Sequence, residues 1–220
     1  LAFINKMDKL GANYTHAIET IHDRLKADPI PVQWPIGEGS TFRGVVDLIE
    51  QRALTWVDEL GEEVVEIPIP SELEVDVLAA REAMLEAIVE TNDVLMGKYL
   101  EEEEITAKEL RLALREATIL GRIQPVLCGS SLRNKGVQPL LDAIVNYLPS
   151  PLDIPPVQGE NTKKNRIEER PADPQAPLAA LVFKIATDPY AGQLAYFRVY
   201  SGTINRGNVY LNPAKSGRER

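Results

Sequence analysis

The sequence is poor in residues that usually carry metal or nucleophilic chemistry. It has one cysteine, Cys128, and two histidines, His16 and His22. A single thiol cannot form an internal disulfide, and no histidine follows Cys128, so a buried side chain is favoured over a nucleophile. The histidines are six residues apart on an expected helix, which places them on different faces. We therefore expect neither a catalytic thiol nor a histidine metal site.

Long apolar runs are also missing. No run approaches the roughly 18 residues that span a bilayer, and no basic-then-apolar leader opens the chain. We therefore expect a cytoplasmic protein without a membrane partner. The 220 residues, 44% hydrophobic and 26% charged, are ordinary for a globular protein and predict two domains or one domain with a large insertion.

The net charge of −9 is unevenly distributed. Residues 58–104 carry 16 acidic and 2 basic side chains, whereas residues 105–220 carry 10 acidic and 16 basic ones. The acidic segment disfavours nucleic-acid binding there and leaves two alternatives, a basic partner protein or a solvated helical face. Four consecutive acids, 101–104, point in different directions, which favours solvated charges over a catalytic or cation-binding cluster.

The apolar run at 1–4 leads directly into Asn5-Lys6-Met7-Asp8, and a polar turn after a strand is where open α/β sheets place binding residues. Asp8 offers two acceptors that match the N1–H and the exocyclic amino group of guanine, a donor pair that adenine lacks. The stem of Lys6 can lie along a flat ring, and Asn5 can brace neighbouring loops because it is both donor and acceptor. The alternative is an ordinary polar turn.

Hydrophobic periodicity and capping residues predict the remaining elements. We expect strands at 1–5, 64–67 and 123–128, a β meander at 32–57, and helices at 13–25, 71–92, 95–100, 106–120 and 137–148. Capping boxes are expected at Ser71/Glu74 and Thr106/Glu109, and Pro29 and Pro31 end the first helix. Because the strand, turn and helix at 123–148 repeat the order at 1–25, we expect one parallel sheet with both polar turns on its carboxyl edge.

The C-terminal part of the sequence has the pattern of strands and loops, without predicted helices. Prolines between 149 and 156 close the first domain, and 159–177 is predicted to be a polar linker or an exposed loop. Strands are expected at 181–185, 192–200 and 209–211. They would begin a small β-barrel, although about three strands are too few to close one.

Three groups of segments resemble bacterial elongation factor G, a translational GTPase: 2–8, 125–130 with 134–142, and 183–185 with 197–202. The resemblance runs through essentially the whole chain. It implies an α/β fold, the C-terminal half of a P-loop-type GTPase domain with a mixed α+β insertion, followed by the start of an all-β barrel domain. The implied division is 1–31 (GTPase portion with the guanine-reading motif), 32–120 (inserted acidic subdomain), 121–158 (GTPase portion with a second base-contacting turn), 159–176 (linker) and 177–220 (start of β-barrel domain II).

The resemblance also implies a binding site for GTP or GDP. Asn5, Lys6, Met7 and Asp8 match the guanine-reading motif, with Met7 at its variable position. Ser130 and Ser131 match the second base-contacting turn, whose backbone amide bonds the guanine oxygen. Family members commonly have Ser-Ala there, and serine keeps that amide. No catalytic residue is assigned, and Mg²⁺ is implied for the parent protein with no ligand in this chain.

The implied partner is the ribosome, bound by a monomeric factor in the family's manner: the acidic insertion docks the ribosomal stalk protein, and the β-barrel domain touches small-subunit ribosomal RNA. Candidate phosphate contacts are Arg198, Arg206, Lys215, Arg218 and Arg220.

One family feature is missing from the sequence. No G-x-x-x-x-G-K-S/T phosphate loop occurs in it, and in the family this loop and the switch regions precede the Asn-Lys-x-Asp motif. We therefore expect an internal piece of a factor that drives translocation, unable by itself to hydrolyse GTP or bind it tightly. The alternatives are a noncatalytic stalk-binding module and a related ribosome-bound GTPase of release-factor or ribosome-protection type.

Overall fold

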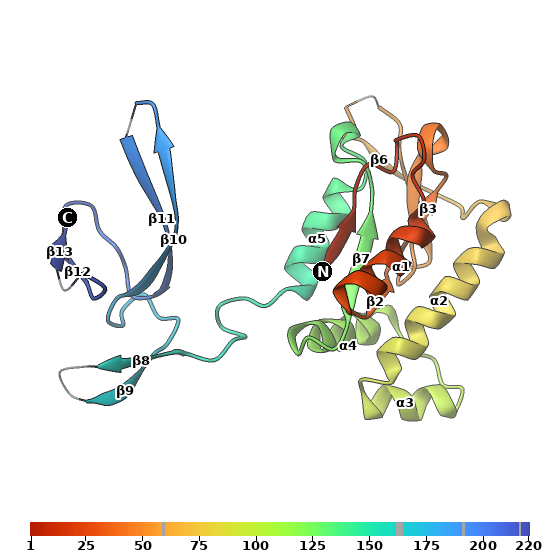
Figure 1. Cartoon of the computed structure of the whole chain (residues 1–220). Coiled ribbons are helices and arrows are strands. Elements are labelled where there is room, and N and C mark those ends of the chain that lie inside the picture. The colour runs from red at the N-terminus through yellow and green to blue at the C-terminus, as the bar shows by residue number, and fades with distance from the viewer. Residues whose placement is uncertain (59, 162–164, 191, 216) are drawn as a thin grey trace. The chain divides into compact units, whose positions relative to one another are not determined.

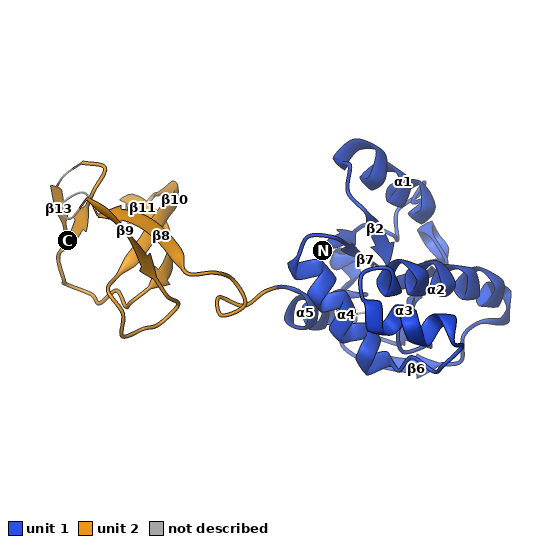
Figure 2. Cartoon of the chain, turned by 90° about the horizontal axis from the view of Figure 1, so that it is seen from below, with its two compact units in different colours: residues 1–148 blue, residues 149–220 orange. Residues whose placement is uncertain are grey.

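The computed structural model describes residues 1–58, 60–161, 165–190, 192–215 and 217–220. They form two compact units, Leu1–Leu148 and Pro149–Arg220 (Figure 2). The first unit mixes helices and strands and the second is built from strands, as the predicted fold class requires. The finer division into five parts stays a prediction. Among the described residues, no helix has the length and apolar character needed to cross a membrane.

A three-stranded parallel sheet organises the first unit. Its order is β1 (Ala2–Ile4), β7 (Gln124–Cys128) and β2 (Pro29–Pro31). Ile4 lies opposite Cys128, and β1 and β7 run side by side (Figure 1). This pairing confirms that the strands before the two polar turns belong to one parallel sheet, and it shows that they are neighbours. The sequence did not predict β2 as a strand, because its two prolines lack N–H groups; an edge position tolerates them.

Four of the five predicted helices begin at the expected caps or within two residues of the expected start. They are α1 (Tyr14–Leu25), α3 (Asp93–Leu100), α4 (Ala107–Ile119) and α5 (Val137–Tyr147). The Thr106/Glu109 capping box of α4 is confirmed. The box at Ser71 is wrong for α2 (Glu74–Val89), because Ser71 lies in a 3-10 turn, Ser71–Leu73, and Leu73 occupies the cap position without a side-chain bond.

The predicted meander at 32–57 and the predicted strand at 64–67 form one antiparallel sheet of four strands. Its order is β3 (Gln33–Ile36), β4 (Gly44–Asp47), β5 (Arg52–Trp56) and β6 (Val64–Ile67). We call it the inserted sheet. The main hydrophobic core joins it to α2, α4 and β7. A smaller core cluster lies beneath the first polar turn and contains Met7, Tyr14, Phe42, Val45, Trp56 and Cys128.

The second unit consists of three antiparallel strand pairs. They are β8 (Val157–Asn161) with β9 (Arg166–Arg170), β10 (Ala179–Asp188) with β11 (Gly192–Ser201), and β12 (Tyr210–Asn212) with β13 (Gly217–Glu219). The first pair includes part of the segment 159–176, which was predicted to be a linker. Its strands are largely exposed and polar, so they lack the apolar alternation by which a strand is recognised. The described strands form separate pairs and no closed barrel.

Candidate functional site

The two predicted turns meet at the carboxyl ends of β1 and β7. The N–H of Gly129 donates to the Ile4 carbonyl over 3.0 Å, and the N–H of Met7 donates to the Gly129 carbonyl over 3.0 Å. These bonds continue the sheet pairing beyond the last strand residues. Residues more than 120 positions apart in sequence are thus held against each other by backbone contacts.

Asn5 connects the turns through its side chain. Its Nδ2 donates to Ser131 Oγ over 2.9 Å, and the N–H of Ser131 donates to Asn5 Oδ1 over 3.0 Å. The N–H of Lys6 donates to the same Oδ1 over 2.7 Å. The amide expected to read the guanine oxygen therefore already has a partner, the side chain of Asn5.

Asp8 lies beside this connection with its side chain only 15% exposed. A hydrogen bond with the Ser130 side chain lowers the pKa of the Asp8 carboxyl, and the positive charges of Lys9 and Arg133 lower it further, against the opposing effect of desolvation. The Lys9 amine is 3.7 Å from an Asp8 oxygen. Asp8 is therefore an ionised acceptor at neutral pH, as recognition of two donors on one edge of a base requires.

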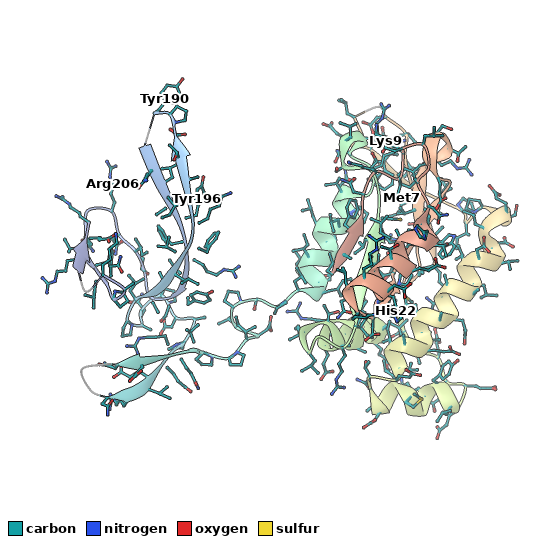
Figure 3. All side chains as sticks on the ribbon, viewed as in Figure 1. Met7, Lys9, His22, Tyr190, Tyr196 and Arg206 are labelled. Atoms are coloured by element: carbon teal, nitrogen blue, oxygen red, sulfur yellow. The ribbon has the colours of Figure 1, made fainter. Side chains whose placement is uncertain are left out.

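Lys6 and Met7 occupy opposite environments in the same turn. Lys6 is exposed, and its φ of 64° is in the left-handed region, which costs a non-glycine residue about 1 kcal/mol. Met7 is 1% exposed and packs in the smaller core cluster, inside the unit beneath the more exposed Lys9 (Figure 3). Met7 therefore anchors the turn, whereas Lys6 is exposed to solvent.

Ser130 shapes the second turn from inside. It is fully buried, and its N–H donates to the Lys135 carbonyl over 2.8 Å. Its hydroxyl also accepts from the N–H of Arg133 over 3.4 Å. Of the six predicted site residues, the structure thus leaves Asn5, Lys6 and Ser131 exposed, keeps Asp8 partly buried, and buries Met7 and Ser130.

A third segment, at Glu38 and Gly39, contacts the first turn and was not predicted. The N–H of Gly39 donates to the Met7 carbonyl over 2.8 Å, and Glu38 Oε1 accepts from the N–H of Tyr14 over 2.7 Å. The sequence predicted this segment only as part of the β meander at 32–57, and nothing in it indicated the contact.

Two other expectations concern reactive groups. Cys128 is fully buried, and burial raises the pKa of its thiol, so it is protonated and shielded. Among the described residues, no group of three His, Cys, Asp or Glu side chains is placed to hold a metal ion. What this edge of the sheet offers is hydrogen-bonding side chains, the ionised carboxylate of Asp8 and the linked Asn5 and Ser131.

Comparison with known proteins identifies two family models. The model described as the elongation factor Tu GTP binding domain matches residues 1–150, and the model for elongation factor G domain 2 matches residues 177–220. Elongation factors G of Thermotoga petrophila and of Thermotoga sp. (strain RQ2) are each 50% identical over all 220 residues. The chain spans 32% of the length of each of these relatives.

A solved structure is also similar. A crystal structure of a protein from Thermus thermophilus matches 99% of this chain with a TM-score of 0.73 and 33% identity, over 29% of that protein's own length. The similarity therefore extends through both units in sequence and in backbone.

Proposed function

Since this chain belongs to the translational GTPase family of elongation factor G, we propose that its two turns bind the guanine of GTP or GDP in a cytoplasmic factor that drives ribosomal translocation. The observation that carries the proposal is the double hydrogen bond between Asn5 and Ser131, which joins the turns at one edge of the sheet. Ligands of open α/β proteins bind at this edge.

The chemistry of base recognition follows from the exposed groups. The Asp8 carboxylate accepts from N1–H and the exocyclic amine of guanine, and the Lys6 stem covers the ring. The N–H of Ser131 turns from Asn5 Oδ1 to the guanine oxygen, or is shared between the two acceptors. Asn5 keeps the turns together through its second bond, from Nδ2 to Ser131 Oγ.

We assign binding of the phosphates and of Mg²⁺ to parts of the factor outside these residues. The sequence contains no G-x-x-x-x-G-K-S/T loop, and the described residues hold no metal-binding cluster. When bound, Mg²⁺ neutralises charge on the transferred phosphoryl group. The isolated chain should therefore neither hydrolyse GTP nor bind it tightly, because most positioning for hydrolysis comes from the phosphate contacts.

Two ribosomal partners fit the surfaces of the chain, one for each unit, and we propose that a monomeric factor binds them. On α2, α3 and the turn after α3, ten acidic side chains are exposed and suit a basic patch of the stalk protein; they are Glu74, Asp76, Glu82, Glu86, Glu90, Asp93 and Glu101 to Glu104. In the second unit, Arg198, Arg206, Lys215, Arg218 and Arg220 offer phosphate contacts to ribosomal RNA. The match to domain 2 of elongation factor G favours this factor over a release-factor or ribosome-protection type.

The test uses the chain alone and a chimera, defined as elongation factor G of Thermotoga petrophila with these 220 residues in place of its aligned segment. We expect the chimera to bind GDP in preference to ADP and to hydrolyse GTP on ribosomes. Isothermal titration of the isolated chain with GDP should show no binding at micromolar concentrations. Equal affinity of the chimera for GDP and ADP would contradict the guanine assignment, and micromolar binding by the chain alone would contradict its dependence on other segments.

A further inference from the structure

The connection between β5 and β6 of the inserted sheet packs against the second base-contacting turn. Asn134 Nδ2 donates to the carbonyls of Leu60, over 3.2 Å, and of Gly61, over 3.0 Å. Gln138 Nε2 donates to the same Gly61 carbonyl over 2.7 Å, and its Oε1 accepts from Trp56 Nε1 over 3.2 Å. We call the bonds from Asn134 and Gln138 to these carbonyls the clamp.

The two segments that the clamp joins also approach each other closely through their backbones. Gly61 has a φ of +66°, and a Cβ on it would lie 2.5 Å from the Arg133 carbonyl oxygen and 2.8 Å from that of Asn134. Asn134 itself has a φ of 52°, a left-handed conformation that asparagine tolerates better than most residues. Neither segment can shift toward the other, so the inserted sheet fixes the position of the turn.

Asn134 also closes the turn that presents Ser131. Its N–H donates to the Ser131 carbonyl over 3.2 Å, while Ser130 and Lys135 exchange two backbone bonds of 2.8 and 3.0 Å. A displacement of Asn134 therefore moves the Ser131 peptide unit directly. Asn134 therefore bonds the inserted sheet through its side chain and bonds Ser131, whose amide is proposed to read the base, through its backbone.

The first turn is held by the same sheet through a different loop. The N–H of Gly39, between β3 and β4, donates to the Met7 carbonyl, the position between Lys6 and Asp8. Two loops of the inserted sheet thus contact the two base-contacting turns, one each.

We infer that the inserted sheet is a positioning element of the base pocket and that Asn134 and Gly61 are its positioning residues, acting through the Ser131 amide on the guanine oxygen. This inference rests on the proposed function, since it needs these turns to bind guanine. It adds that residues outside the pocket set guanine affinity, so the insertion is mechanically part of the nucleotide site.

Asn134→Gly in the chimera tests the inference. Glycine keeps the left-handed backbone and removes only the side-chain donor, so the loss of two hydrogen bonds should raise the GDP dissociation rate about tenfold. Lys26→Gly is the matched control, because Lys26 has the same φ of 52° at the end of α1, away from both turns. Its GDP dissociation rate should equal that of the unsubstituted chimera. Gln138→Ala provides a second clamp variant and should act in the same direction.

A nucleotide without the guanine oxygen separates positioning from general destabilisation. The diphosphate of 2-aminopurine riboside keeps the exocyclic amine for Asp8 and lacks both the acceptor for the Ser131 amide and the N1–H. It should bind the unsubstituted chimera more weakly than GDP does, so the quantity compared is the change in affinity that the substitution causes for each ligand. Asn134→Gly should weaken GDP binding and leave the affinity for this analogue unchanged. Equal losses for both ligands, or no loss for GDP, would overturn the inference. Failure of the unsubstituted chimera to prefer GDP over ADP would instead overturn the proposed function on which it rests.

Discussion

Asn5 and Ser131, 126 positions apart in sequence, exchange hydrogen bonds in both directions, from Asn5 Nδ2 to Ser131 Oγ and from the Ser131 N–H to Asn5 Oδ1. The second bond uses the backbone N–H, which an alanine at position 131 would also have. The first bond uses the serine hydroxyl, which alanine lacks. The serine therefore adds a side-chain bond to a backbone contact, and substitutions at this position can separate the two.

Ser131→Ala and Ser131→Pro separate the hydroxyl from the amide. Alanine keeps the N–H but loses the bond from Asn5 Nδ2. The backbone bonds between Gly129 and the first turn still hold the turns together, so we expect GDP affinity of the chimera to change by less than about threefold. Proline removes the N–H, yet position 131 opens the 3-10 turn Ser131–Arg133, where proline is accepted. Ser131→Pro should therefore weaken GDP binding by about tenfold or more, on the order of one lost hydrogen bond to a buried acceptor. Competition with labelled GDP measures both, and similar affinities for the two variants would show that the amide is not used.

Met7 and Leu10 provide a stability test within one turn. Met7 is 1% exposed, whereas Leu10 is fully exposed. Met7→Ala should lower the free energy of unfolding of the first unit by about 2–5 kcal/mol, and Leu10→Ala should change it by less than about 0.5 kcal/mol. Urea denaturation of the chain followed by tryptophan fluorescence reports on this unit, because both tryptophans, Trp34 and Trp56, lie in it. A loss at Leu10 as large as at Met7 would contradict the anchoring role.

The parts of the fold that were predictable are those with local signals. The Thr106/Glu109 capping box and the apolar runs before the two turns can be recognised from a few neighbouring residues. The structure confirms the helix and the two strands that they predict. The β8–β9 pair was missed because an exposed polar hairpin has no buried face to impose an alternating pattern. The capping box at Ser71 failed because the same residue types also suit a 3-10 turn.

In the candidate site too, features with a local signal were predictable and contacts that depend on tertiary packing were not. Asn5 and Asp8 could be proposed from the sequence because their functional groups suit loop bridging and guanine recognition. The structure shows the bridging by Asn5, and the base contact of Asp8 stays a prediction. The contacts of Gly61 and Gly39 were not predictable, because they are made by backbone atoms whose partners depend on tertiary packing. The identity of a side chain carries no signal for a bond made by the backbone of its residue, and here two such contacts join the inserted sheet to the two turns.

Glu109 makes a pH-dependent contribution to stability. Its carboxylate lies 2.6 Å from Lys98 Nζ and accepts from the Thr106 N–H over 2.9 Å. The hydrogen bond from Lys98 first, and the bonds from Thr106 next, lower the pKa of Glu109 from 4.5 to about 2. A folded-state pKa below the unfolded value means that the contribution is present above pH 4.5 and is lost as pH falls toward about 2.

Glu109→Gln should therefore lower the melting temperature of the chain at neutral pH, and the difference from the unsubstituted chain should vanish as pH approaches about 2. Glu116→Gln removes the same charge from an exposed position of α4 outside the cap, so it is the matched control. Circular dichroism melts across this pH range measure the difference. A difference that stays constant with pH would show that the loss is not linked to ionisation of Glu109.

Asp8→Asn should change which base the chimera prefers. The carboxylate offers two acceptors, which match the two donors of guanine, whereas an amide offers one acceptor and one donor. Xanthine has a carbonyl where guanine has its exocyclic amine, so the amide donor gains a partner with xanthine and opposes a donor with guanine. With guanine, the bond from N1–H is then made to a neutral acceptor, and the amide donor lies opposite the exocyclic amine, which is also a donor. Both bonds to the charged carboxylate are therefore lost, and GDP affinity should fall by about 100-fold or more.

The same variant should bind xanthosine diphosphate more tightly than it binds GDP, and competition titrations with the two nucleotides measure the reversal. Asp142→Asn is the control, because Asp142 is an exposed carboxylate on α5 away from both turns, and it should leave the preference for GDP intact. Because the pKa of Asp8 is lowered, the ionised acceptor persists as pH falls toward the ordinary aspartate value of 3.8, and GDP binding by the unsubstituted chimera should not weaken through titration of Asp8 above that pH. Loss of GDP binding without any gain for the xanthine nucleotide would mean that Asp8 supports the turn and does not read the base.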